Sequence, residues 1–214
     1  SRYSNAVFEF FSFLQKTPEA GMACGQLLNT DGSRQNSIAP FLSLWTLLFN
    51  LPFLETCFPK RYPSKRYAHP GPIEVDSGIG ACLLVRKQAL RDVGPFDERY
   101  FFFFEETDWA FRMKTAGWKI FHVPSAFIYH LQGQSIGRNL LSRIEFYRSR
   151  YQFIRKWKTP LARLLFSAVI FLRLLVNWLL TALANLLTFG LSRKIRSKWL
   201  LYSRLLLWHF KRCP

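Results

Sequence analysis

The stretch YFFFFEETDWAFRMKTAGW, from Tyr100 to Trp118, places four phenylalanines directly before two glutamates, and an aspartate follows two residues later. Burying aromatic rings is favourable, whereas burying ionised carboxylates without partners is costly. Residues 107–116 have the composition of a helix, with Thr107 in the position of an N-cap and Gly117 in that of a C-cap. We therefore expect an aromatic strand that leads into a helix, with the acids at or just before its positive end.

The residues alone leave two interpretations of these acids open. In the first, Glu105, Glu106 and Asp108 only cap the helix, and Asp108 pairs with Arg112 four residues later. In the second, the aromatic strand walls a pocket and brings a carboxylate to its mouth. A carboxylate that is partly shielded from water can act as a general base, provided that its pKa and geometry suit the proton it removes.

Around this stretch, apolar runs alternate with Gly and Pro signals, which indicates a mixed α/β domain over residues 1–137. Residues 40–57 are ambiguous between helix and loop. The proline-rich and basic segment Pro59–Pro72 is a loop, either a solvated excursion or one that meets a phosphate-bearing substrate. The other expected elements are a helix ending before Pro18, short strands on both sides of an Asp31–Gly32 turn, a buried strand over Gly80–Val85, a helix ending at Gly94, and two strands in KIFHVP and AFIYHL.

Charge divides the chain into two parts. Residues 1–137 carry 14 Lys and Arg against 12 Asp and Glu, whereas residues 138–214 carry 16 against one. Such a basic segment attracts polyanions. Its cations alternate with Leu, Phe and Trp runs, which favours an anionic membrane surface as partner over nucleic acid. The four cysteines are widely spaced without metal-site spacing, which is typical of a cytosolic compartment.

From Leu140 onward the pattern is helical almost to the end of the chain. Leu161–Leu191 is long enough to cross a bilayer, but seven polar residues on it and Ser192 just after it fall within an arc of about 120°. A second helix with a basic start and two tryptophans follows. Three arrangements stay open: a helix lying in the membrane interface with its polar edge outward, one true crossing, or a soluble helical cap or oligomer interface. The polar stripe consists of Arg163, Ser167, Arg173, Asn177, Thr181, Asn185, Thr188 and Ser192.

Five motifs in one order, from about Asn5 to Trp157, resemble inverting family 2 glycosyltransferases of the bacterial rhamnosyltransferase-like branch. FDERYFFFFEETDWAFRMKTAGWKIFHVP resembles the segment GxFDExFFxYxEDxDLxxRxxxxGxxxxxxP of that family. PEAGMACGQLLNTDGSRQNS resembles PxxGxxGxxLxxxDGxxQxS, and VDSGIGACLLVRKQAL resembles a stretch ending GAxxLxRRxAF. HLQGQS matches HxxGxS, and FYRSRYQFIRKW resembles YxxRNxxxFxRK.

The resemblance implies roles for individual residues. The acidic pair of the family falls on Glu105 and Glu106, and its following aspartate on Asp108. The second acid of the pair is the base that deprotonates the acceptor hydroxyl, so that role falls on Glu106, although the family has Asp there. The longer side chain shifts the carboxylate by about 1 Å. Either the site has adjusted or Asp108 serves instead, and we favour Glu106.

The resemblance also implies binding residues. The acceptor pocket would include Asp76, Ser77, Gly80, Ala81 and Trp109. His130 corresponds to a histidine that in some relatives helps hold a divalent cation, Mg²⁺ or Mn²⁺, on the donor diphosphate. The alternative for His130 is a strand histidine hydrogen-bonded to backbone.

The implied fold is the C-terminal part of a Rossmann-like GT-A fold over residues 1–137, followed by an all-helical, membrane-associating extension over residues 138–214. The implied enzyme transfers a sugar, rhamnose by the branch name, from a nucleotide-sugar donor to a lipid-linked glycan during cell-surface polysaccharide synthesis. It would work at the cytoplasmic face of the bacterial inner membrane as a peripheral or monotopic protein. The nucleotide-binding half with its Asp-x-Asp-like motif is missing, so we expect the chain to be inactive by itself. The competing hypotheses are a non-catalytic basic membrane-binding module and a degenerate remnant.

Overall fold

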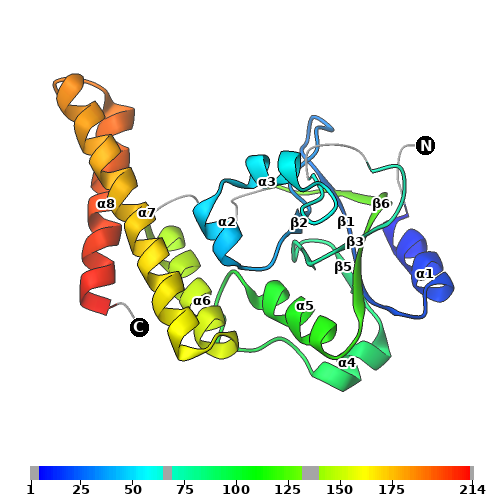
Figure 1. Ribbon diagram of the computed structural model, residues 1–214. Helices are drawn as coiled ribbons and strands as arrows, with labels where there is room; N and C mark the ends of the chain where they lie inside the picture. The colour runs from blue at the N-terminus through cyan, green and yellow to red at the C-terminus, as the bar shows by residue number, and fades with distance from the viewer. Residues whose placement is uncertain (1–4, 65–68, 132–139, 213–214) are drawn as a thin grey trace. The chain divides into compact units, whose positions relative to one another are not determined.

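The computed structural model describes residues 5–64, 69–131 and 140–212, and the chain divides into two compact units between residues 134 and 135 (Figure 1). The boundary expected from charge, after residue 137, lies outside the described residues and stays a prediction.

The first unit is built on a four-stranded sheet in the order β3-β6-β1-β5. At its centre β1 (Ala20–Leu28) and β6 (Lys119–Tyr129) pair in parallel. At its edges β5 (Leu83–Val85) runs antiparallel to β1, and β3 (Ile73–Val75) runs antiparallel to β6. Because β1 and β6 are parallel, their C-terminal ends lie at the same end of the sheet.

Helices cover both faces of this sheet (Figure 1). On one face α1 (Ala6–Lys16) packs Phe10 and Leu14 against the alanines of β1 and β6. On the other face α4 (Lys87–Val93) and α5 (Glu105–Thr115) form the second core. This second core contains Met22, Cys24, Ile38, Val75, Ala89, Trp109, Ala110, Met113 and Ile120.

A separate two-stranded sheet lies over the α5 side, where β2 (Ile38–Ala39) pairs with β4 (Ser77–Gly78). The ambiguous segment between residues 40 and 57 forms two short helices, α2 (Leu44–Leu48) and α3 (Leu51–Cys57). Each begins at a side-chain cap, Ser43 for α2 and Asn50 for α3, which accepts a hydrogen bond from the backbone N–H of the third helical residue.

Helix α5 begins at Glu105, so the expected N-cap at Thr107 is wrong. The phenylalanine run is also no strand, because Phe103 and Phe104 have φ of 66° and 69° and turn the chain into the helix. The two glutamates therefore belong to the first turn of α5 and do not precede it.

The expected pair of strands in KIFHVP and AFIYHL is one strand, β6, which continues through Pro124. The ladder with β1 passes from Val123 opposite Gly25 directly to Phe127 opposite Gln26. Residues 124–126 thus form a bulge, where the missing N–H of proline needs no partner.

Two further strand predictions were too long. β5 begins at Leu83 and is half-buried, because Gly80 and Ala81 lie in an exposed turn. After the turn at Asp31–Gly32, which is present, Arg34 forms only an isolated bridge with Leu28. The expected helices before Pro18 and Gly94, and the absence of helix or strand in the described part of Pro59–Pro72, are confirmed.

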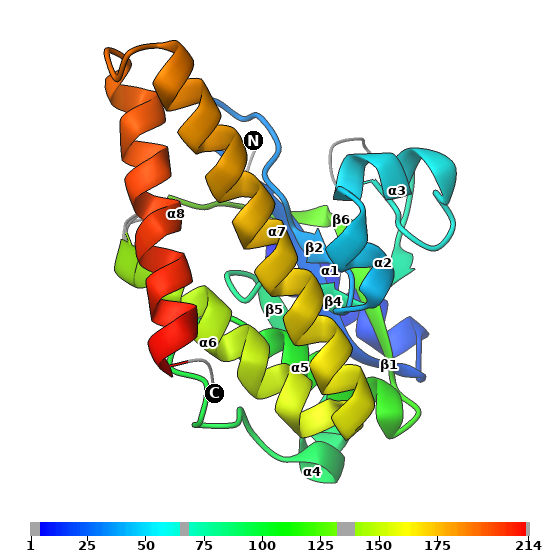
Figure 2. The same ribbon diagram turned by 60° about the vertical axis from the view of Figure 1, so that its left-hand side comes forward.

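The second unit consists of α6 (Leu140–Trp157), α7 (Pro160–Leu187) and α8 (Arg193–Arg212), as Figure 2 shows. Thr159 caps α7, with a proline at the first helical position. A short turn then reverses the chain, and α8 packs back along α7. The predicted fold class is confirmed: a mixed α/β part, consistent with a Rossmann-like GT-A fold, is followed by an all-helical extension.

Candidate active site

Glu106 lies in the first turn of α5, half-buried, opposite the exposed turn after β4. The side chain of Glu106 lies next to Gly80 in this turn. A Cβ atom placed on Gly80 would lie 3.8 Å from the Cβ of Glu106, which is ordinary contact distance. Among the described residues, no hydrogen-bond partner meets the buried Oε2 of Glu106. This oxygen is therefore shielded from water and has no partner in the described part of the protein.

Burial, and after it the negative charge of Glu105, raises the pKa of Glu106 to about 7. The pKa of Glu105 is also raised, chiefly by burial. A hydrogen bond between the two carboxyl groups favours the proton on Glu106 and the charge on Glu105. Of the two acids, Glu106 is therefore the one whose carboxyl group titrates near neutral pH.

Asp108 has a different environment, although it lies only two residues further on. Its carboxylate is 0% exposed and accepts a hydrogen bond from Arg112 Nε at 3.0 Å, the i,i+4 pair expected from the sequence. Tyr100 donates its hydroxyl to the other oxygen at 3.3 Å. Arg112 in turn donates to the carbonyls of Val93 and Pro95. Asp108 thus holds the loop before α5 in place through Tyr100 and Arg112. These contacts agree with the first interpretation of this acid, in which it pairs with Arg112.

Trp109 also faces the core. Its indole N–H donates to the carbonyl of Gly94 at 2.8 Å, and its ring packs 4.4 Å from that of Phe96. These contacts are those of a core residue, and its assignment to substrate binding stays a prediction without support from its surroundings.

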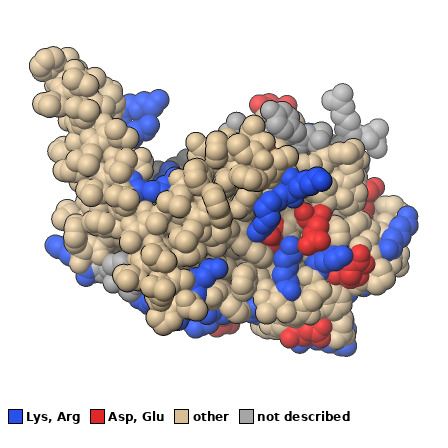
Figure 3. All heavy atoms as spheres, viewed as in Figure 1, with Lys and Arg blue, Asp and Glu red and all other residues tan. Residues whose placement is uncertain are grey.

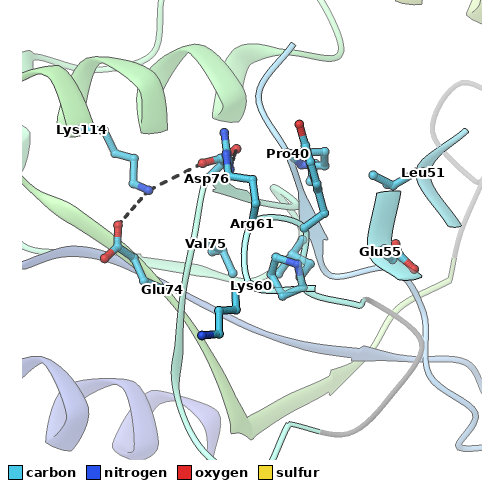
Figure 4. A pocket seen from close by; sticks show the side chains of 13 residues that line it. Pro40, Leu51, Glu55, Lys60, Arg61, Glu74, Val75, Asp76 and Lys114 are labelled. Atoms are coloured by element: carbon cyan, nitrogen blue, oxygen red, sulfur yellow. Dashed lines mark hydrogen bonds and ion pairs between the residues drawn. The ribbon is translucent and has the colours of Figure 1, made fainter. Parts of the chain in front are cut away.

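Asp76 lines a pocket of about 230 Å³ on the same side of the sheet (Figure 4). Its carboxylate accepts hydrogen bonds from Arg61 Nη1 and from the backbone N–H of Phe41, both at 2.9 Å, and lies 3.7 Å from Lys114 Nζ. Lys114 also pairs with Glu74 at 2.9 Å. Three cations and three carboxylates line the pocket: Lys60, Arg61, Lys114, Glu55, Glu74 and Asp76.

Glu106 is not among the residues that line this pocket. Four residues of chain lead from Asp76 to Gly80, so the Cα atoms of these two residues lie at most roughly 14 Å apart. Between them Ser77 is fully buried, and its hydroxyl donates to the carbonyl of Gly78, whereas Gly80 and Ala81 are exposed. The structure therefore brings Gly80 to Glu106, places Asp76 in a pocket of its own, and turns Ser77 inward.

His130 follows the last residue of β6 and is held by Gln35. Its Nδ1 lies 3.0 Å from Gln35 Oε1, and Gln35 Nε2 donates to the carbonyl of His130 at 2.6 Å and to Asn29 at 2.7 Å. In the part of the chain that the structure describes, no group of three or more His, Cys, Asp or Glu could hold a metal ion. The rest of the HLQGQS motif lies mostly outside the described residues.

Sequence reasoning missed the pocket partners of Asp76. A signal was present, because Glu74 and Asp76 are two residues apart on an extended segment and therefore point to the same side. Two carboxylates on one side require nearby cations, and Lys114 and Arg61 supply them. Glu55, which approaches from α3, has no comparable signal in the sequence.

Comparisons with known proteins give a partial match. No family model matches the chain. An N-acetylglucosaminyl-diphospho-decaprenol L-rhamnosyltransferase of Mycobacterium tuberculosis, in strains CDC 1551 and H37Rv, is 41% identical over 88 residues. The match covers 38% of this chain and 29% of each relative, so the chain spans less than a third of the length of these relatives.

Proposed function

We propose that this chain is part of an inverting glycosyltransferase that transfers a sugar, L-rhamnose in the first instance, to a lipid-linked glycan. The observation that carries the proposal is the 41% identity over 88 residues with an enzyme whose name specifies rhamnosyl transfer to N-acetylglucosaminyl-diphospho-decaprenol. The acidic residues in the first turn of α5 supply a candidate catalytic base for such a transfer. The donor is a nucleotide-activated sugar, and the product belongs to a cell-surface polysaccharide.

In this proposal Glu106 is the general base. Its carboxylate removes the proton from the acceptor hydroxyl, the freed oxygen forms a bond to the anomeric carbon, and the bond from that carbon to the nucleoside diphosphate breaks with its electron pair. A single displacement inverts the anomeric centre and needs only one base. Two features support the role: the pKa of about 7, near the operating pH of a cytoplasmic enzyme, and an Oε2 without a partner among the described residues.

The other site residues receive lesser roles. Glu105 is the supporting charge that keeps the pKa of Glu106 high. Asp108 is a positioning residue, because it is fully buried and paired with Arg112. The charged pocket around Asp76 suits the polar part of the acceptor, since it offers both donors and acceptors of hydrogen bonds.

A divalent cation, Mg²⁺ or Mn²⁺, belongs to the proposed reaction, where it would neutralise the departing diphosphate. The described residues do not fit it by themselves, because His130 shares its surroundings with the amides Gln35 and Asn29 and not with carboxylates. We therefore derive no step through the cation. The proposed location is the cytoplasmic face of the bacterial inner membrane, where a lipid-linked acceptor is concentrated.

The test is transfer of labelled L-rhamnose from its nucleotide donor to N-acetylglucosaminyl-diphospho-polyprenol by the protein expressed from its complete gene. Glu106→Gln should lower kcat by about 10²–10⁴-fold. Glu98→Gln, at an exposed glutamate in the preceding loop, is the matched control and should retain activity. Full activity of Glu106→Gln would remove the base assignment. Absence of transfer from every nucleotide sugar tried, with a folded protein, would overturn the enzymatic proposal in favour of a membrane-binding module.

A further inference from the structure

Helix α7 exposes a broad apolar face along its whole length. The exposed residues recur at helical spacing, so they lie on one side of the helix. We call this side, together with the turn after it, the α7 apolar face. It consists of Leu161, Leu164, Leu165, Leu172, Val176, Leu179, Leu180, Leu183, Leu186, Leu187, Phe189 and Leu191.

The polar stripe of α7 lies on the side of the helix opposite the α7 apolar face. The buried residues Phe166, Ile170 and Leu174 continue at spacings of three and four into Asn177 and Thr181. Asn177 donates to the carbonyl of Arg173, and Thr181 donates to that of Asn177. Arg163 and Arg173 of the same stripe are exposed, so only part of the stripe packs toward the neighbouring helices, and the expectation of a polar edge turned outward stays a prediction.

Helix α8 extends the apolar face and borders it with charge. The ring of Phe210 packs 5.3 Å from that of Phe171, and Trp178 donates to Ser203 at 2.8 Å. Leu200 and Leu207 are exposed, seven residues apart, on the flank next to these contacts. Next to these leucines, on one line along α8, lie three exposed cations at spacings of eleven and seven residues: Arg193, Arg204 and Lys211.

By length and composition α7 could cross a membrane. Its packing with α8 argues against it, because the two helices contact each other along their lengths and α8 carries seven Lys and Arg residues. A crossing of α7 with α8 still packed would carry Arg204, near the middle of α8, into the hydrocarbon, where a charge is costly.

We propose that the α7 apolar face, with the flank of α8, rests on an anionic lipid bilayer, so that both helices lie in the plane of one leaflet and neither crosses it. The apolar side chains enter the acyl region, and the cationic edge of α8 lies at the level of the anionic headgroups. An anionic bilayer complements both parts of this surface, because its acyl region takes up apolar side chains and its phosphatidylglycerol-type headgroups pair with the row of cations beside them. This deepens the membrane association contained in the proposed function.

Vesicle co-sedimentation without donor or acceptor tests the surface. The protein should bind phosphatidylcholine–phosphatidylglycerol vesicles more tightly than phosphatidylcholine vesicles. The double substitution Leu179→Glu and Leu183→Glu should weaken binding by about tenfold or more. Val7→Glu, at an exposed apolar position of α1, is the control and should bind as the unmodified protein does. Arg204→Glu with Lys211→Glu should reduce the preference for the anionic vesicles.

Orientation needs a second measurement. Single cysteines at Leu164, Leu172 and Leu183, each labelled with an environment-sensitive dye, should be quenched to a similar extent by one shallow lipid quencher. Much weaker quenching at Leu172 than at Leu164 and Leu183 would indicate a crossing, in which the middle of the helix lies deepest, and would overturn the in-plane arrangement.

Unchanged vesicle binding of the Leu179→Glu and Leu183→Glu variant would overturn the surface. Loss of self-association in that variant, without vesicle binding by the parent protein, would assign the face to a second copy of the chain. Because these readouts involve no sugar transfer, they fail or succeed independently of the proposed enzymatic function.

Discussion

Glu106 and Asp108 illustrate how two acids on one helical turn acquire different chemistry. Asp108 is held by Arg112 and Tyr100, so its charge is compensated and its oxygens are occupied. Glu106 is buried beside another acid and holds an oxygen without a partner in the described structure. Environment, not residue type, separates a positioning acid from a candidate base.

The pH dependence of transfer should follow Glu106. Because a base must be ionised, kcat/KM should rise with pH through about 7. Glu105→Gln removes the neighbouring negative charge, which lowers the pKa of Glu106 and should move this limb toward lower pH. Rate profiles of both proteins over the same pH range measure the shift. An unmoved limb would mean that a group other than Glu106 sets it.

Stability should respond oppositely at the two acids. Asp108→Asn leaves the largely buried Arg112 without its counter-charge, at a cost of about 3 kcal/mol in the free energy of unfolding. The pKa of Glu106 is raised from 4.5 to about 7 on folding, so its carboxyl group lowers stability progressively as pH rises through that window. Glu106→Gln should therefore be as stable as the parent or more so above pH 7.

Urea unfolding of the two variants at pH 8 checks this contrast. Equal destabilisation by Asp108→Asn and Glu106→Gln would mean that the two acids have similar environments. The roles proposed for them, a positioning residue and a base, would then lose their basis.

At the scale of elements, β4 is where the chain approaches itself most closely. A Cβ atom on Gly78 would lie 2.3 Å from the Cβ of Cys24 on β1, whereas one on Gly80 would meet only Glu106, at ordinary contact distance. Gly78→Ala should therefore cost roughly 1–3 kcal/mol of stability by overpacking. Gly80→Ala, two residues on, is the control and should unfold at nearly the same denaturant concentration as the parent. Similar midpoints for both variants would show that β4 can move away from β1.

Element types followed from local pattern, but their ends did not. The Asp108–Arg112 pair and the C-cap glycine at position 94 depend on short spacings, which the sequence contains. The start of α5 depends on the left-handed backbone of two phenylalanines, and no propensity predicts φ > 0 for such a residue. The continuity of β6 through Pro124 depends on a bulge opposite β1, which is a tertiary feature.

At the scale of the whole molecule, charge and hydrophobicity are distributed unevenly along the chain. Residues 138–214 carry 16 Lys and Arg against a single acidic residue, in the same helices that expose long runs of leucine. The sequence therefore predicted a polyanionic partner. It could not predict which side of α7 faces outward, because a polar stripe of Asn and Thr is compatible with water and with helix packing alike.

Salt should distinguish a membrane from nucleic acid as that partner. DNA binding by this basic part would rest on counterion release alone and should fall by about a thousandfold or more between roughly 50 and 200 mM salt. Binding to anionic vesicles should fall much less, because the apolar contribution of α7 is not screened. Parallel titrations of the full chain against DNA and phosphatidylglycerol vesicles measure both slopes. The Leu179→Glu and Leu183→Glu variant retains all the cations, so its vesicle curve should become as steep as its DNA curve. Equally steep curves for the parent protein would mean that charge alone drives binding and that the exposed leucines serve another contact.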